Sequence, residues 1–321
     1  MSRLGGNRGR ALLAVVGVAS SAVFLWLAVR NADLAAVRRA IQEARIGLVL
    51  LAVAVFGCAY VLQAARWRRI ARTPHPSLRR FYGMVLSGLA CNNVLPVRIG
   101  EFLRASWLSR EAPMPGGRAL GSVALDRVCD VATLALFLAI GLQAVATTEW
   151  LVRLAVGAAI AIVLIGGVLI GARLYTARRT RDRRSRSRIR RLIRDTVEML
   201  AEPVGRRRVA VWMGLSIGAW TLSTFATILV GRSIGIEFTP IEAVFVTSAL
   251  ALGVAIPSSP GYVGTYQWLG VAALGLLDVP VEEALAFTIL LQASWFIPTT
   301  IAGGAILGVR ALRRDERIGP G

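Results

Sequence analysis

Charged side chains interrupt an apolar sequence at residues 92–104. Arg98, Glu101 and Arg104 recur at a spacing of three, shortly after the paired amides Asn92 and Asn93. On a helix this spacing keeps the three side chains within roughly a third of the circumference. Guanidinium groups bind phosphate through paired hydrogen bonds, while a carboxylate binds a cationic or hydroxyl group. The segment therefore predicts a site for a polar group that carries phosphate.

A second set of charges follows in the next apolar stretch. Asp126 and Asp130 lie four residues apart, on one helix face, and Arg127 lies beside them. Two interpretations stay open at this point. The charges form a self-neutralising network that fixes the neighbouring helices, since buried charges normally pair, or they complete a binding site for a headgroup. The two are compatible, because a network can rearrange around a ligand.

A second interruption lies in the other half of the chain, at residues 256–264. It carries proline and glycine but no charge. Broken backbone leaves amide and carbonyl groups free to line a polar path or to bind a headgroup. The alternative is a tight packing turn. The residues expected to shape the two interruptions are Pro96, Gly100, Pro257, Pro260, Gly261, Gly264 and Gln267.

The rest of the sequence is typical of a membrane protein with several spans. Hydrophobic residues make up 55% of the 321 positions, and the mean hydropathy is +0.61. The formal net charge is +20, and every basic residue is arginine. Because these arginines cluster at the ends of apolar segments, the positive-inside rule explains them without a nucleic-acid partner.

Apolar length predicts an all-α integral membrane protein with about six spans, within a single polytopic domain over residues 1–321. The short apolar segments around the two interruptions are too short to span and predict two re-entrant broken-helix hairpins. The alternative is that each broken unit crosses the membrane twice. The predicted spans are Ala11–Val29, Ile46–Ala65, Ala119–Thr147, Leu151–Ala172, Val209–Arg232 and Ala284–Val309.

The distribution of arginine predicts the orientation. The N-terminus, residues 66–80, the basic loop 173–208 and the C-terminus are all cytoplasmic in one arrangement. Apolar residues at helical spacing in that loop predict an amphipathic helix on the membrane surface. The first broken hairpin then enters from the cytoplasm and the second from outside. The two halves would form an inverted repeat, a transporter architecture.

Residue patterns for enzyme chemistry are sparse. Cys58, Cys91 and Cys129 have no metal-type spacing, and no histidine pairs with a carboxylate in the sequence pattern. The sequence predicts no metal and no cofactor.

The string Pro96-x-Arg98-x-Gly100-Glu101-x-x-Arg104, with Asp126–Arg127-x-x-Asp130 and Pro260–Gly261-x-x-Gly264, resembles the lysylphosphatidylglycerol synthase transmembrane-region family. This flippase-like domain also forms the N-terminus of the multiple peptide resistance factor. The resemblance covers roughly residues 10–312 and implies a domain that moves lipid across the inner membrane. The soluble aminoacyl-transferring domain of the larger members is absent from this sequence, so lipid synthesis is not carried over. Gln267 stands where the resemblance leads us to expect an acidic residue.

We therefore expect an inner-membrane lipid translocase that moves a phospholipid or a polyprenyl-linked lipid. Its partners would be membrane lipids, with a lipid-modifying enzyme as a further candidate. Arg98 and Arg104 would bind phosphate, and Glu101, Asp126 and Asp130 would tune the site. The alternatives are a membrane enzyme or an accessory scaffold of lipid or envelope glycolipid modification.

Overall fold

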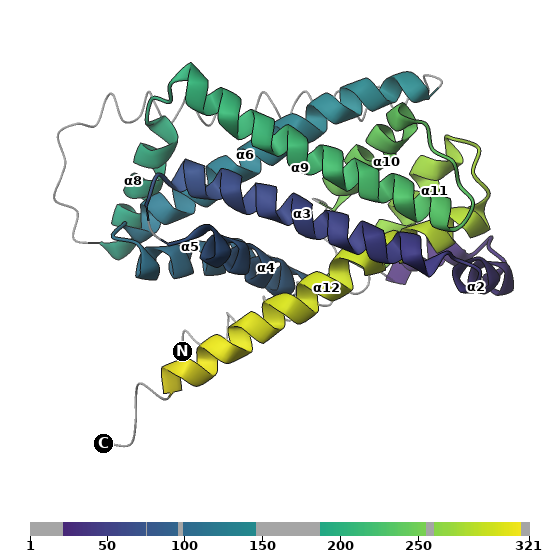
Figure 1. Ribbon diagram of the computed structural model, residues 1–321, viewed down its shortest axis with the longest axis horizontal. Helices are drawn as coiled ribbons and strands as arrows, with labels where there is room; N and C mark the ends of the chain where they lie inside the picture. The colour runs from purple at the N-terminus through teal and green to yellow at the C-terminus, as the bar shows by residue number, and fades with distance from the viewer. Residues whose placement is uncertain (1–21, 75, 96–98, 146–186, 255–259, 316–321) are drawn as a thin grey trace, which may run out of the picture.

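The computed structural model describes residues 22–74, 76–95, 99–145, 187–254 and 260–315. Every regular element in these ranges is helical, which confirms the predicted all-α class (Figure 1). The helices are α2 (Leu34–Gln42), α3 (Ile46–Ala71), α4 (Leu78–Val94), α5 (Gly100–Glu111), α6 (Gly116–Gly141), η1 (Leu142–Ala144), α8 (Arg188–Ala201), α9 (Arg206–Ser233), α10 (Pro240–Gly253), η2 (Pro260–Tyr262), α11 (Thr265–Gly275) and α12 (Val281–Asp315).

Three of the described helices are long and apolar enough to cross a membrane, namely α3, α9 and α12. They coincide with three of the predicted spans. Helix α6 matches a fourth and has 26 residues, but it carries charged residues in its middle. The predicted span Leu151–Ala172 and most of Ala11–Val29 lie outside the described residues. The total of six spans therefore stays a prediction.

The end of α3 differs from the prediction. The sequence predicts a span that ends at Ala65 and basic residues on the cytoplasmic side after it. Instead the helix continues to Ala71, and Arg66, Trp67 and Ile70 are 0% exposed. Arg66 is buried because it meets buried carboxylates from another helix, a tertiary contact that local composition does not reveal.

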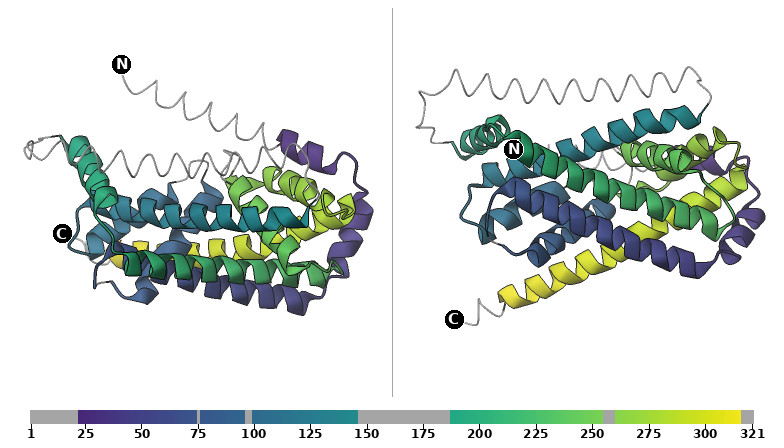
Figure 2. Two further views of the ribbon diagram at one scale, coloured as in Figure 1. Left: turned by 90° about the horizontal axis from the view of Figure 1, so that it is seen from above. Right: turned by 45° about the horizontal axis from the view of Figure 1, so that its top comes forward.

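Helices α3 and α9 pack side by side and run in opposite directions (Figures 1 and 2). The amide of Arg45, just before α3, donates to the carbonyl of Ser233 at the end of α9, at 2.8 Å. Further along, Arg66 near the end of α3 bonds Ser216 in the first half of α9. Helix α3 is the second predicted span of its half and α9 the second of the other. An antiparallel pairing of equivalent helices is what an inverted repeat requires.

Other helix contacts come in pairs that are related by exchanging the two halves of the chain. Helix α4 packs on α12, and its counterpart α10 packs on α6. Helix α5 packs on α6 within the first half, as α11 packs on α12 within the second. Exchanging the two halves therefore maps each of these α-helix pairs onto another of them, which supports the repeat predicted from topology.

The first hairpin, α4 and α5, closes through glycines. A Cβ on Gly100 would collide with the carbonyl oxygen of Gly88, and one on Gly88 would lie 2.8 Å from the Arg104 side chain. In the second hairpin, α10, η2 and α11, Gly261 and Gly264 have φ of 76° and 86°. Side chains other than glycine rarely adopt this left-handed backbone, so both residues shape the turn.

The two hairpins approach one another at their tips and have their bases at opposite ends of α3. Helix α4 contacts η2, and a Cβ on Gly261 would lie 3.6 Å from the carbonyl oxygen of Asn93. The first hairpin begins at Leu78, shortly after the end of α3. The second begins at Pro240, shortly after Ser233, which is bonded to the start of α3. If α3 spans the membrane, the hairpins enter from opposite faces.

Within the predicted basic loop, the structure describes helix α8 from residue 188 onward. This helix packs on α6, where a Cβ on Gly121 would lie 2.7 Å from Cβ of Met199. Just after α8, one oxygen of Glu202 accepts from Arg72 at 3.0 Å and from Arg118 at 3.1 Å. These ion pairs connect α8 to the end of α3 and the start of α6.

Candidate functional site

Arg66 is the centre of a buried ion cluster that joins three helices. Its Nε donates to Oδ1 of Asp126 at 2.8 Å, and its Nη1 lies 2.8 Å from Oδ1 of Asp130. The same Nη1 donates to Oγ of Ser216 on α9 at 2.6 Å. Both carboxylates come from one face of α6, as their spacing predicted. The arginine side chain is fully buried, so its charge depends on these carboxylates for compensation.

Arg104 attaches the first hairpin to the same cluster. Its Nη2 donates to Oδ2 of Asp126 at 2.9 Å, and its Cζ lies 4.1 Å from the ring centroid of Trp67. A guanidinium over an indole ring gains from the negative face of the π system. The side chain is only 5% exposed. Arg104 was expected to bind phosphate directly, but in the structure it binds Asp126 behind the cavity described below.

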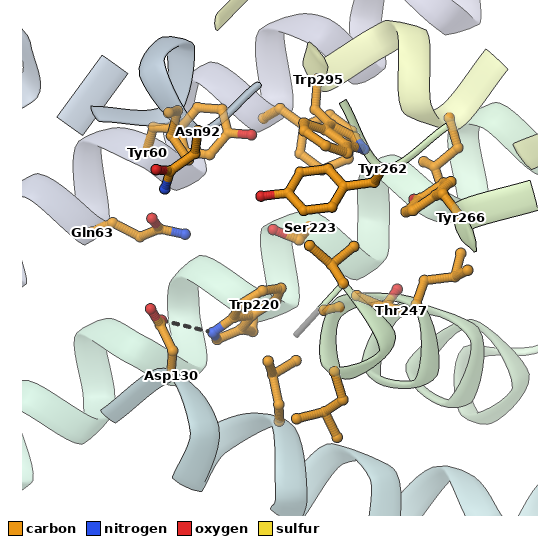
Figure 3. Close-up of a pocket in the computed structure, with 18 of the residues that line it drawn as sticks. Tyr60, Gln63, Asn92, Asp130, Trp220, Ser223, Thr247, Tyr262, Tyr266 and Trp295 are labelled. Atoms are coloured by element: carbon orange, nitrogen blue, oxygen red, sulfur yellow. Dashed lines mark hydrogen bonds between the residues drawn. The ribbon is translucent and has the colours of Figure 1, made fainter. Parts of the chain in front are cut away.

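Arg127 is the most exposed cation of the cluster. It lies 3.1 Å from Oδ2 of Asp126 and 3.3 Å from Oδ2 of Asp130, and its side chain is 39% exposed. The indole Nε1 of Trp220 donates to Oδ1 of Asp130 at 3.1 Å (Figure 3). Three guanidinium groups thus share two carboxylates, and Glu101 adds a third carboxylate in the wall of the same cavity. The buried network of charges, one of the two interpretations that the sequence left open, is therefore present.

Glu101 lies apart from this cluster and bonds the tip of α4. Both of its carboxylate oxygens accept from Nδ2 of Asn92 at 3.2 Å. Oδ1 of Asn92 in turn accepts from the amide of Gly100 at 2.8 Å. Asn92 therefore bridges the break between α4 and α5 and fixes the position of Glu101.

Asn93 and Gln267 connect the two tips to α12. Nδ2 of Asn93 donates to Oγ1 of Thr300 at 2.8 Å and to Oγ1 of Thr299 at 3.2 Å. Gln267 accepts from the amide of Gly264 at 2.7 Å and donates to Gln292 at 2.6 Å. The side chain of Gln292 then donates to the carbonyl of Gly261 at 2.6 Å. The neutral Gln267 is therefore part of the hydrogen-bonded frame of the second turn.

A cavity of about 280 Å³ lies between the two hairpins and helices from both halves. Its walls differ in chemistry. The polar side chains Gln63, Asn92 and Asp130 lie on one side in Figure 3, and the aromatic rings of Tyr262, Tyr266 and Trp295 lie on the other. The charged residues in its wall are Glu101, Arg127 and Asp130.

The predicted site residues divide into four groups. In the cavity wall are Asn92, Asn93, Glu101, Arg127 and Asp130. Behind it lie Arg104 and Asp126, and at the hairpin turns lie Gly100, Pro260, Gly261, Gly264 and Gln267. Outside the described residues fall Pro96, Arg98 and Pro257.

Sequence reasoning missed Arg66, Gln63 and Trp220. Gln63 and Arg66 lie three residues apart on one face of α3, and a glutamine inside an apolar run is itself a signal that we did not use. Arg66 was hidden because it begins a run of basic residues at the end of that apolar stretch. Trp220 had no signal in the sequence that separates it from other aromatic residues of an apolar span.

The comparison with protein families agrees with the resemblance. The family described as lysylphosphatidylglycerol synthase TM region matches residues 13–303. The chain belongs to this family. A search of curated proteins found no match. As a member of the lysylphosphatidylglycerol synthase TM region family, the chain is a membrane protein associated with membrane lipids, and its function lies in lipid modification or translocation.

Proposed function

We propose that this protein is a lipid translocase that moves an anionic phospholipid or a polyprenyl-phosphate lipid across the bilayer. The observation that carries the proposal is the cavity between the two broken hairpins, with Arg127 in its wall. Discontinuous helices that meet between two repeats are a common location for transporter sites. The cavity is near the lower end of the roughly 300–1,000 Å³ of small-ligand pockets. It would take a headgroup while the acyl chains stay in lipid.

Arg127 would provide the direct contact with phosphate. Its side chain is 39% exposed, whereas that of Arg66 is 0% exposed, and its planar fork suits phosphate oxygens. Arg66 and Arg104 would hold Asp126 and Asp130 in place. Arg98 remains a proposed second phosphate ligand.

Glu101 and the hairpin turns would control access. Glu101 is attached to Asn92 at the break of the first hairpin, so a headgroup that competes for Asn92 would loosen that tip. The second tip contacts the first, so movement of either one would open the cavity. We place the protein in the inner membrane with both termini cytoplasmic, as the arginine distribution suggests.

The second candidate is an enzyme of lipid modification, which the family description also admits. Asp126 and Asp130 are each shared between arginines, and carboxylates held in this way are poor general bases. This chemistry favours binding over catalysis. An accessory scaffold for a lipid-modifying enzyme is the third candidate.

Purified protein in proteoliposomes tests the proposal. Fluorescent phosphatidylglycerol and a fluorescent polyprenyl-phosphate sugar would be followed by quenching from the outer face. We expect the protein to raise the transbilayer rate at least tenfold over empty vesicles. Arg127→Ala should remove most of this increase. Arg38→Ala, an exposed arginine on α2, should not change it.

Equal rates with native protein, with Arg127→Ala and without protein, for both lipids, would overturn the translocase proposal. A parallel incubation in detergent, where transbilayer movement has no meaning, tests whether the protein is an enzyme of lipid modification. Chemical conversion of a lipid there would favour modification over transport.

A further inference from the structure

We propose that the cavity recognises a headgroup rich in hydroxyl groups, such as a sugar or a polyol attached to phosphate. This inference rests on the proposed function and specifies the substrate class of the same site. It starts from the polar groups of the cavity that have no partner in the described protein. These groups are neutral, whereas each charged side chain of the cavity wall already has at least one partner.

Gln63 is the clearest unpaired group. Its side chain lines the cavity and is only 7% exposed. Figure 3 shows its amide pointing into the space between the two walls. Among the residues that the structure describes, none forms a hydrogen bond with this amide. This amide faces the cavity (Figure 3), and a ligand hydroxyl, which both donates and accepts, satisfies either end of it.

Tyr60 adds a second neutral group. It lies one helical turn before Gln63 on α3 and also lines the cavity. Its hydroxyl group is directed toward the cavity beside Asn92 (Figure 3) and has no hydrogen-bond partner in the described ranges. Two neutral groups on one face of a helix thus present donors and acceptors to the same space.

The carboxylates of the cavity leave little capacity for a cationic headgroup. Asp130 is bound by Arg66, Arg127 and Trp220. Both oxygens of Glu101 accept from Asn92. An ammonium group would have to displace one of these partners, whereas a hydroxyl group finds Gln63 and Tyr60 free. The charges therefore argue against an amine as the main recognition element.

Aromatic rings on the opposite side of the cavity suit the C–H face of a sugar or polyol ring. Tyr262, Tyr266 and Trp295 line it together, and Trp295 is within ring contact of both tyrosines, at 6.3 Å and 5.9 Å between centroids. The negative face of an aromatic ring attracts weakly positive C–H groups. A pyranose or inositol ring presents such C–H groups on its faces and hydroxyl groups around its edge. The two walls match these two surfaces.

The transport assay with three lipids tests the inference. A polyprenyl-phosphate sugar and phosphatidylinositol carry hydroxyl rings, and phosphatidylcholine carries a cation without hydroxyl groups. We expect both hydroxylated lipids to move at least tenfold faster than phosphatidylcholine. Gln63→Leu should lower their rates about tenfold and leave phosphatidylcholine unchanged. Gln42→Leu, at an exposed glutamine of α2, is the matched control.

A binding measurement separates recognition from folding. In a detergent without sugar groups, inositol phosphate and glucose 1-phosphate should raise the melting temperature of the native protein, and phosphocholine should not. Gln63→Leu should abolish this rise without lowering the melting temperature of the free protein, because the leucine removes an unpaired amide.

Two results have different consequences. Equal transport of all three lipids, with Gln63→Leu slowing them equally or not at all, would overturn the hydroxyl inference and leave the translocase intact. Absence of transport for every lipid, together with no stabilisation by any headgroup, would overturn both. A preference for one hydroxylated lipid over the other identifies whether the ring comes from a polyprenyl carrier or from a phospholipid.

Discussion

Arg66 and Asp126, 60 residues apart in sequence, form a 2.8 Å ion pair in which both side chains are 0% exposed. The pair joins α3 to α6, and Ser216 and Asp130 extend it to α9 and along α6. Such a pair contributes little net stability relative to an apolar core, but loss of one partner leaves an uncompensated buried charge. It therefore commits the three helices to one arrangement around the cavity.

Arg66→Met should be strongly destabilising. We expect a loss of about 3–5 kcal/mol, the cost of breaking a buried ion pair. Thermal unfolding in detergent, followed by size-exclusion chromatography, measures this as a lower melting temperature. Arg66→Met with Asp126→Asn should cost less than the sum of the single changes, because each single change already removes the Arg66–Asp126 ion pair. Arg38→Met, at an exposed arginine, is the control. An unchanged melting temperature for Arg66→Met would contradict this role.

Gly100→Ala should open the first hairpin. The new methyl group would collide with the carbonyl of Gly88 and lie 2.6 Å from Oδ1 of Asn92. Overpacking of this kind costs about 1–3 kcal/mol. Transport should fall with stability, since Asn92 positions Glu101.

Gly214→Ala is the matched control for this change. Gly214 lies inside α9, and nothing lies within 4 Å of the position of its missing Cβ. Alanine should therefore stabilise the helix by up to about 1 kcal/mol. Equal melting temperatures for the two alanine variants would contradict the close approach of α4 and α5.

Much of the fold could be predicted from the sequence, because the length of an apolar run and the breaks at glycine or proline depend only on neighbouring residues. The two interruptions of the apolar sequence and a helix within residues 173–208 were predicted in this way. The site was only partly accessible. The i, i+4 spacing placed Asp126 and Asp130 on one face, and helix periodicity does not depend on distant contacts.

The missed part of the site depends on contacts between distant segments. Arg66 belongs to a basic run, and only the antiparallel packing of α3 on α9 places it beside Ser216. Arg104 was expected to bind phosphate directly, and the sequence did not reveal that the ring of Trp67 covers its guanidinium group. The aromatic wall arises because the second hairpin brings Tyr262 and Tyr266 to Trp295 of α12. The spacing of residues in the sequence does not reveal these contacts between distant segments.

Glu111 should make the stability of the first hairpin sensitive to salt. Its carboxylate accepts from Arg310 at 3.0 Å, from Arg80 at 3.3 Å and from the indole of Trp107 at 2.6 Å. These contacts connect the end of α5 to the start of α4 and the end of α12. Because Arg80 is 65% exposed, salt screens part of the attraction. Glu111→Gln should cost about 1 kcal/mol at low salt.

The measurement is the melting temperature at low and at high ionic strength. Native protein should lose more stability with added salt than Glu111→Gln does. Glu43→Gln, at an exposed glutamate after α2, should behave like the native protein. The same salt dependence in all three proteins would exclude a role for this ion cluster.

The bases of the two hairpins should be accessible from opposite sides of the membrane. The exposed Ser77 precedes α4 near the C-terminal end of α3, and the exposed Glu237 precedes α10 near its N-terminal end. Because α3 is long and apolar enough to span, these two positions should lie on different faces. Ser77→Cys should react with an impermeant thiol reagent only from the cytoplasmic face, since arginines surround it. Glu237→Cys should react only from the other face. The background would replace Cys58, Cys91 and Cys129 by alanine, and reaction of both positions from one face would exclude the inverted hairpins.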